Sequence, residues 1–207
     1  MGLIRLLTND PLAFFIVAIP LLYSVVIHEV AHGWVAYKMG DPTAKWLGRL
    51  SLNPLRHLDL VGTLMLFLVG FGWAKPVPVN LQNIPNQRKG LVFVSAAGVL
   101  ANILIAFLAL FIFRFFGFTP KGLAAVTFYT LVQINITLAS LNLIPIPPLD
   151  GSKILMGLAP ASLRFLLMRL EPYGLFIMVG LLYTGVLDSF IGFFRKLIIF
   201  VIKLFLP

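Results

Sequence analysis

The fold is decided by residues 11–32, which read PLAFFIVAIPLLYSVVIHEVAH. The first 17 of these residues, 11–27, include no charged side chain, and a helix needs about 20 mostly apolar residues to cross a bilayer. The apolar run continues into a helical segment that we expect to end at Gly40. These features predict a membrane-spanning helix near the N-terminus, with the polar HEVAH sequence close to one end of the span.

The composition of the whole chain agrees with a membrane protein. Of its 207 residues, 60% are hydrophobic and 11% are charged, whereas soluble domains have about 45–50% apolar and about 25% charged residues. The net charge of +9 could indicate nucleic acid, but membrane proteins gather lysine and arginine on the cytosolic side. We therefore expect no nucleic-acid partner. Because cysteine is absent, any metal must bind the 3 histidines or the 7 acidic residues.

Further apolar stretches qualify as spans or come close. Residues 91–113 are uncharged, and residues 122–149 are uncharged but interrupted late by prolines. Residues 172–187 are shorter, and residues 189–206 either form a further span or lie along the membrane interface. We predict an all-α membrane protein, a polytopic helical bundle of about five to six spans, with residues 1–207 as a single domain.

Residues 60–74 are apolar but too short for a span, and alternating polar and apolar residues flank them at 48–53 and 75–80. Non-helical backbone at membrane depth requires shielding by protein or by a water-filled cavity. We therefore predict a re-entrant element with short β-strands at these two places. Pro76 and Pro78 cannot donate ladder hydrogen bonds, so the second strand is expected at an edge.

Lysine and arginine are distributed unequally along the chain and predict its orientation. Residues 38–89 and 150–171 contain ten of them, against three at Arg5, Arg114 and Lys121. Because these residues collect on the cytosolic side, we expect the N-terminus outside and the HEVAH sequence toward the cytosol. No small-x-small cleavage site follows the first apolar run, so we expect it to be retained rather than removed as a signal peptide.

The HEVAH sequence is the main candidate for chemistry. On a helix, His28 and His32 stand one turn apart on the same face, so both imidazoles can bind one metal ion. Glu29 lies beside them, where its carboxylate can accept a proton from a metal-bound water. The pattern is expected by chance about 0.0004 times in a chain of this composition, and ionisable groups at the end of an apolar run are costly. It therefore predicts a metal site rather than a polar helix end.

Two histidines require a third ligand, because catalytic zinc typically has three protein ligands and an open position for water. The candidates are His57, Asp59, Asp150, Glu171 and Asp188. Asp150 is favoured because it follows the proline-broken end of residues 122–149, where a carboxylate can turn back into the bundle. It could instead begin the next helix as an N-cap. The main rival is His57, in a loop that we expect to be cytosolic and solvated.

Four further motifs follow the HEVAH sequence: GRLSLNPLRHLDLVGT (48–63), GWAKPVPVN (72–80), AAGVLAN (96–102) and NLIPIPPLDG (142–151). Together, and in this order, the five motifs resemble the site-2 protease family of intramembrane zinc metalloproteases. Val99 stands where the family's G-P-x-x-N motif has proline. The resemblance implies a minimal member without a PDZ or CBS domain, and we expect an integral, multi-pass protein of a prokaryotic plasma membrane.

The same resemblance implies one zinc ion per chain, bound by the two HEVAH histidines and Asp150, with Glu29 as the catalytic base. It also places Asn102 and Asn142 near the active site, with Asn102 aiding substrate or oxyanion binding. From the residues alone, Asn102 could equally make an interhelical hydrogen bond beside small residues, and Asn142 could cap the broken helix.

The implied activity is hydrolysis of peptide bonds in transmembrane protein substrates. Zinc lowers the pKa of a bound water toward about 7, and Glu29 accepts the proton. A substrate helix must unwind, because its carbonyls are held in i→i−4 hydrogen bonds, and the expected strands could receive it by strand addition. The lipid bilayer is the other partner expected. Alternatives are a transporter or a non-catalytic membrane-protein binder with an intramembrane metal site, and a metallohydrolase acting on lipid or prenylated tails.

Overall fold

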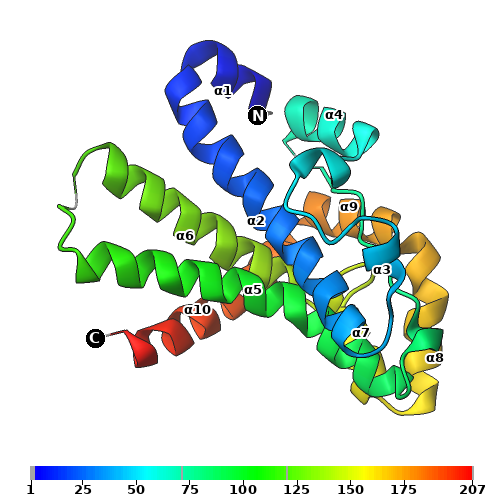
Figure 1. Cartoon of the computed structure of the whole chain (residues 1–207). Coiled ribbons are helices and arrows are strands. Elements are labelled where there is room, and N and C mark those ends of the chain that lie inside the picture. The colour runs from blue at the N-terminus through cyan, green and yellow to red at the C-terminus, as the bar shows by residue number, and fades with distance from the viewer. Residues whose placement is uncertain (1–2, 71, 120, 207) are drawn as a thin grey trace.

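The computed structural model of the chain describes residues 3–70, 72–119 and 121–206. Regular structure in these residues is almost entirely helical (Figure 1), which confirms the predicted all-α class. The α-helices are α1 (Leu3–Asn9), α2 (Pro11–Lys38), α3 (Thr43–Trp46), α4 (Leu60–Val69), α5 (Gln87–Phe115), α6 (Leu123–Asn142), α7 (Asp150–Leu158), α8 (Ala161–Leu170), α9 (Gly174–Thr184) and α10 (Val186–Phe205). Short 3-10 helices are η1 (Pro54–Arg56), η2 (Leu81–Asn83) and η3 (Glu171–Tyr173).

The long helix α2 begins at a strong N-terminal signal. The Asp10 side chain accepts a hydrogen bond from Ala13 N, and Pro11 has no N–H to leave unpaired at the first helical position. The helix continues for 28 residues, through Pro20, to Lys38. It includes both the apolar run and the HEVAH sequence, so the helix predicted there is confirmed.

Helices α5 and α6 run antiparallel to each other, and α2 packs against both (Figure 1). The buried core where α5, α6 and α10 meet consists of Val99, Ala106, Ala109, Val132, Ile136, Ala139, Ile198 and Ile202. Alanines at such a contact let helix backbones approach closely, and van der Waals packing of this kind drives helix association in a bilayer. Helix α2, which contains the HEVAH sequence, thus lies against α5 and α6.

Four helical stretches in the described residues are long and apolar enough to cross a membrane. They are Pro11–Lys38, Gln87–Phe115, Leu123–Asn142 and Ala161–Thr184. The last combines α8, η3 and α9 and begins earlier than the predicted 172–187. The predicted stretch 189–206 is helical in α10 but is more charged, and its Arg195 donates a hydrogen bond to Gln133 of α6. Length and composition thus support four spans, against the five to six expected.

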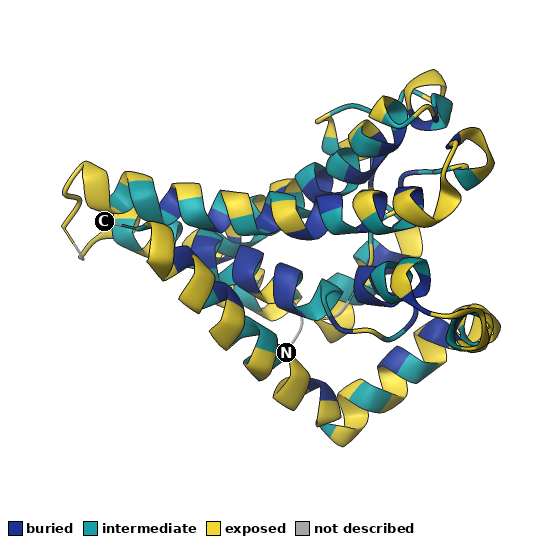
Figure 2. Ribbon diagram, turned by 90° about the horizontal axis from the view of Figure 1, so that it is seen from below, coloured by how far each residue is buried: buried dark blue, intermediate teal, exposed yellow. Residues whose placement is uncertain are grey.

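Exposed residues lie along the outer sides of these helices, while buried residues face neighbouring helices (Figure 2). Many of the exposed residues are large and apolar. Phe15, Leu104, Tyr129 and Phe176, from four different helices, are each more than half exposed. Soluble monomers rarely expose apolar patches of this extent, whereas hydrocarbon tails solvate them. The surface therefore agrees with an integral membrane protein.

The predicted re-entrant β element is absent from the described residues, which contain no β-strand. One isolated antiparallel bridge joins Leu58 to Ala74, and Lys75 N–H donates to His57 O at 2.8 Å. Between the two residues of this bridge, α4 begins at Leu60. The side chain of Asp59, which precedes the helix, caps it by accepting a hydrogen bond from Gly62 N. The apolar stretch is thus a short helix closed at its base by a single bridge.

Side-chain contacts explain why residues 75–80 do not form a ladder. Val77 N–H donates to the Glu29 carboxylate at 2.8 Å, and Asn80 N–H donates to the Asp41 carboxylate at 2.7 Å. The two prolines of the segment have no N–H to donate. Alternation of polar and apolar residues here reflects a loop fixed by side chains of distant segments, so the expectation of an edge strand was wrong.

Asp41, just beyond the end of α2, is buried and fastens this loop to the helix. Its carboxylate accepts hydrogen bonds from Thr43 N, Thr43 Oγ1, Asn80 N and Asn83 Nδ2. Burial alone would raise the pKa of Asp41, but hydrogen bonds to its charged form outweigh burial and hold the pKa below the usual value. A carboxylate that is ionised at neutral pH therefore joins the loops that follow α2 and precede α5.

Candidate metal centre

His28, His32 and Asp150 meet in the interior of the helix bundle. The Nε2 atoms of the two histidines are 3.0 Å apart, and each lies 3.1 Å from Asp150 Oδ2. All three side chains are buried. The histidines lie one turn apart on α2, and Asp150 reaches them from the first residue of α7.

The proline-containing turn between α6 and α7 brings Asp150 to the histidines. After α6 the chain turns back through residues 143–149 before α7 begins. Gly151 permits this turn, because a Cβ there would clash with the backbone carbonyls of Leu143 and Ile144. A larger residue at position 151 would displace the start of α7, and Asp150 with it, from the metal centre.

The hydrogen bonds of the imidazoles leave both Nε2 atoms as electron-pair donors. His32 Nδ1 lies 2.7 Å from Val94 O, a backbone carbonyl that can only accept, so this nitrogen holds the proton. His28 Nδ1 lies 2.6 Å from Asn102 Oδ1. Asp150 Oδ2 has no hydrogen-bond donor among the described residues. Three electron-pair donors held so close together, away from water, form a group that could hold a metal ion.

The spacing of the three atoms fits zinc. Two ligands about 2.0–2.1 Å from a tetrahedral ion lie about 3.3 Å from each other, close to the separations of 3.0 and 3.1 Å in this cluster. Imidazole nitrogen and carboxylate oxygen are both ligands of catalytic zinc, which keeps a fourth position open. The donor set and its geometry therefore agree with a catalytic zinc site.

Gly98 of α5 leaves room for an ion beside the two ligand nitrogens. A Cβ at this position would lie 2.5 Å from His32 Nε2 and 2.6 Å from His28 Nε2. Only a residue without a side chain allows α5 to approach the metal centre this closely. The glycine of the AAGVLAN sequence is thus required by the metal centre as well as by helix packing.

Glu29 lies next to the metal ligands in sequence and is half-buried. One of its carboxylate oxygens, Oε2, accepts a hydrogen bond from Val77 N at 2.8 Å. Gly33 permits this contact, because a Cβ there would lie 2.8 Å from both Val77 Cγ1 and Leu50 Cδ2. The loop that follows α4 therefore closes onto α2 and orients the Glu29 carboxylate.

The two asparagines predicted near the site differ in environment. Asn102 is fully buried and bonded to His28. Asn142 is half-buried at the end of α6 and donates a hydrogen bond to Leu138 O of its own helix at 3.1 Å. Asn102 thus contacts a predicted metal ligand directly, whereas Asn142 is bonded within its own helix.

The rival metal ligands lie in other environments. His57 is only 1% exposed, contrary to the solvated position expected, because its Nε2 bonds to Ser51 O at 2.8 Å and its carbonyl pairs with Lys75. Among the described residues, the metal-binding cluster includes Asp150 and excludes His57. Asp59, Glu171 and Asp188 each lie at the start of a helix, where a negative charge is favourable.

Sequence reasoning missed two polar residues at this centre, Ser24 and Asn135. Both are fully buried, and Asn135 bonds to Asn102 and to Ser24. The available signal was a polar side chain inside an apolar span, which is costly and marks a functional candidate. That signal alone does not separate Asn135 from Gln133, two residues earlier in the same helix.

Comparison with known proteins identifies the family. The protein named "Putative zinc metalloprotease YwhC" of Bacillus subtilis is 41% identical over 180 residues, which cover 84% of this chain and 82% of that protein. This chain belongs to peptidase family M50, the site-2 proteases. The family profile matches residues 118–184, which include Asp150. The protein is therefore a zinc metalloprotease of this family.

Two more relatives of this M50 protein are both named "Putative zinc metalloprotease Rip2". The protein from Mycolicibacterium smegmatis is 31% identical over 182 residues, covering 84% of this chain and 69% of the relative. The protein from Mycobacterium tuberculosis H37Rv is 33% identical over 201 residues, covering 90% and 74%. No solved structure matches this M50 protein.

Proposed function

We propose that this M50 protein is an intramembrane endopeptidase that uses one zinc ion to hydrolyse peptide bonds of transmembrane protein substrates. The observation that carries the proposal is the buried cluster of His28, His32 and Asp150 within a bundle of helices apolar enough to cross a membrane. A metal site on such helices can act on peptide bonds that lie inside the bilayer or at its edge.

Glu29 is the proposed base. Zinc bound at this site would polarise the scissile carbonyl and lower the pKa of a bound water toward about 7. The Glu29 carboxylate accepts the proton and returns it to the leaving amine. Its hydrogen bond from Val77 N fixes one carboxylate oxygen, which reduces the reorganisation needed during proton transfer.

Of the two asparagines, we assign the substrate contact to Asn142. The amide nitrogen of Asn102 donates to Asn135 Oδ1 at 2.8 Å and to Ser24 O at 3.3 Å, so its two hydrogens are used inside the bundle. Asn142 donates one amide hydrogen to its own helix, and its side chain has a second to offer a substrate carbonyl.

The unwound substrate is proposed to pair with the loop at residues 48–53 by strand addition. Leu52 of this loop is exposed, whereas two N–H groups of residues 75–80 already bond to side chains. Leu52→Pro, which removes one N–H, should slow cleavage while zinc is retained. Leu52→Ala keeps the N–H and should cleave like the wild type. Equal cleavage by the two variants would overturn strand addition.

The metal centre is proposed to face the cytosol of a prokaryotic cell, on the basis of the lysine and arginine distribution. Because the chain has no cysteine, single-cysteine variants report its orientation. Trp46 in α3 and Thr119 after α5 are both exposed. A membrane-impermeant maleimide should label Thr119→Cys in intact cells and Trp46→Cys only after permeabilisation. The reverse pattern would invert the proposed orientation.

Zinc content and cleavage of a transmembrane substrate, measured together on purified protein, test the proposed function. Wild type and Glu29→Gln should hold about one zinc per chain, and Glu29→Gln should lose cleavage. His28→Ala and Asp150→Ala should lose both. Asp188→Ala, which removes an exposed carboxylate at a helix start, is the matched control and should retain both.

Three outcomes would contradict the proposal at different points. Wild type purified without chelator and free of metal would favour a non-catalytic binder. Asp150→Ala with normal zinc would remove Asp150 from the ligand set. Glu29→Gln with normal cleavage would exclude Glu29 as the base.

A further inference from the structure

A series of hydrogen bonds between buried polar side chains leads from the predicted metal ligand His28 to two asparagines and a serine. His28 Nδ1 lies 2.6 Å from Asn102 Oδ1, Asn102 Nδ2 donates to Asn135 Oδ1 at 2.8 Å, and Asn135 Nδ2 donates to Ser24 Oγ at 2.8 Å. Asn102 and Asn135 are 0% exposed and Ser24 is 1% exposed. These residues come from α2, α5 and α6, so the chain of hydrogen bonds crosses the centre of the bundle.

Two backbone carbonyls fix the direction of these hydrogen bonds. A carbonyl oxygen can only accept, so the group that faces it must be the NH2 of an asparagine amide. Asn135 Nδ2 faces Leu131 O at 2.8 Å, which turns Asn135 Oδ1 toward Asn102. Asn102 Nδ2 faces Ser24 O at 3.3 Å as well as Asn135 Oδ1, which turns Asn102 Oδ1 toward His28.

The fixed amides determine the tautomer of His28. Because Asn102 presents an oxygen, His28 Nδ1 must hold the proton, and Nε2 is left with its electron pair toward His32 and Asp150. His32 reaches the same state from a single backbone carbonyl, Val94 O. The two ligands thus obtain equivalent tautomers by different means, one from the backbone of α5 and one from side chains of α5 and α6.

We propose that Asn102 and Asn135 form a relay that holds His28 in the Nδ1–H tautomer, with Asn135 as a positioning residue that acts on the metal only through Asn102. The inference rests on the proposed zinc site and deepens it. Groups that bond to the non-ligating nitrogen of a metal-binding histidine orient the ring and raise its basicity. Asn135 is one hydrogen bond further from His28 than Asn102 is. By accepting from Asn102 Nδ2, it turns Asn102 Oδ1 toward His28 Nδ1.

Zinc affinity, measured by chelator competition on purified full-length protein, tests the relay. Asn102→Leu should weaken zinc binding about 10–100-fold, and Asn135→Ala should weaken it by about 10-fold. Ser140→Ala is the matched control, because Ser140 is a buried polar residue of α6 that bonds to Ile136 O of its own helix. It should leave zinc affinity unchanged.

The double variant separates a relay from a general structural effect. If Asn135 acts only through Asn102, adding Asn135→Ala to Asn102→Leu should cause no further loss of affinity. Visible absorption of the Co²⁺-loaded protein should change in Asn135→Ala and remain unchanged in Ser140→Ala. If Asn135→Ala does not fold, Asn135→Ser replaces it, because its shorter side chain also withdraws the acceptor from Asn102.

Additive losses in the double variant would overturn the relay, as would an Asn135→Ala affinity equal to that of the Ser140→Ala control. These failures are distinct from failure of the proposed function. A wild type that binds zinc and cleaves substrate, with Asn135→Ala unchanged in affinity, would refute only the relay. A wild type without zinc would refute the metal site itself.

Discussion

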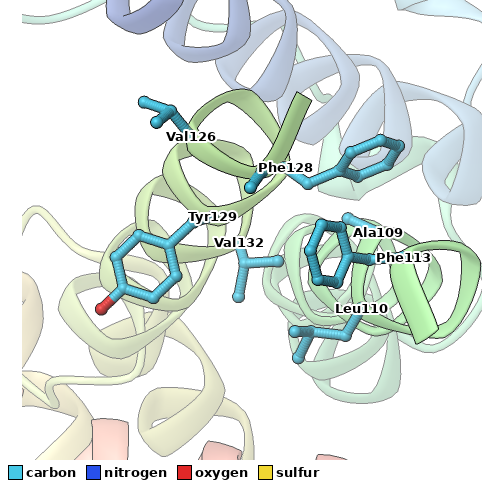
Figure 3. Close-up of a pocket in the computed structure, with 8 residues that line it drawn as sticks. Ala109, Leu110, Phe113, Val126, Phe128, Tyr129 and Val132 are labelled. Carbon is cyan, nitrogen blue, oxygen red and sulfur yellow. The ribbon is translucent and has the colours of Figure 1, made fainter. Parts of the chain in front are cut away.

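The two ends of the α5–α6 pair differ in chemistry although the same helices build both. Toward the metal centre, in the part of the pair that we call the metal end, the fully buried Asn102 and Asn135 bond to each other and connect to His28. Toward the α5–α6 connection, at what we call the apolar end, the helices line an open apolar cavity of about 330 Å³ (Figure 3). Its lining consists of Ala109, Leu110, Phe113, Ala125, Val126, Phe128, Tyr129 and Val132.

Empty volume therefore does not locate the chemistry of this protein. Among the described residues that line the cavity, only Tyr129 has a polar side chain, so the cavity can accept an apolar group but cannot orient a reaction. The metal centre is so closely packed that a single Cβ at Gly98 would clash with both ligand nitrogens. Burying a polar group costs free energy unless the group forms a hydrogen bond. At the metal end, Asn102 and Asn135 form hydrogen bonds with each other and with His28 and Ser24.

The largest expected effect comes from closing the space at the metal end. Gly98→Ala should reduce zinc content to about a tenth of wild type or less, because its Cβ would lie 2.5 Å from His32 Nε2. Metal analysis of the purified variant measures this. Gly180→Ala in α9 is the matched control, since no described atom beyond its chain neighbours and the adjacent backbone of its own helix lies within 4 Å of its added Cβ. Normal zinc in Gly98→Ala would show that α5 can move away without loss of the site.

A polar group placed at the apolar end should have a smaller effect, and that effect should fall on the stability of the fold and not on zinc binding. Val132 is buried in α6, three residues before Asn135 on the same side of the helix. Val132→Asn should lower the free energy of unfolding by about 1–3 kcal/mol, because its amide has no partner there. Denaturation in detergent measures the loss, with Val132→Ala as the control for packing. A loss of zinc comparable with that of Gly98→Ala would contradict the separation of the two ends.

The smallest effect on stability is expected at Asp41. This buried carboxylate lies outside the long helices and accepts several hydrogen bonds. Asp41→Asn should lower the free energy of unfolding by about 1 kcal/mol near neutral pH, since the amide keeps one acceptor oxygen. The folded-state pKa of Asp41 is lowered, so its contribution is present above the unfolded-state value of about 3.9 and is lost as the pH falls through the folded-state value.

Thermal unfolding of wild type and Asp41→Asn as a function of pH measures this contribution. The difference between the two proteins should be constant near neutral pH and should shrink below about pH 4. A difference that stays constant into acid would mean that the hydrogen bonds from Asn80 and Asn83 do not depend on the charge of Asp41.

Features set by local periodicity were predictable. The apolar run predicts α2, and the i, i+4 spacing predicts that His28 and His32 share a face. Asp150 was favoured over its rivals because the prolines indicate a broken helix, although spacing alone allowed a simple N-cap. The strand expected at 75–80 failed because alternation is compatible with a loop whose N–H groups bond to Glu29 and Asp41.

The amino-acid sequence by itself determined the apolar helices, the metal-binding pair on one turn of α2 and the family. These depend on composition and on residues a few positions apart. The tertiary structure decided which carboxylate completes the cluster, which side chains fix His28, and how the loop after α4 meets Glu29. His28 and Asn102 are 74 positions apart, and Glu29 and Val77 are 48 apart. Contacts over such separations follow from how helices pack, and no local pattern encodes them.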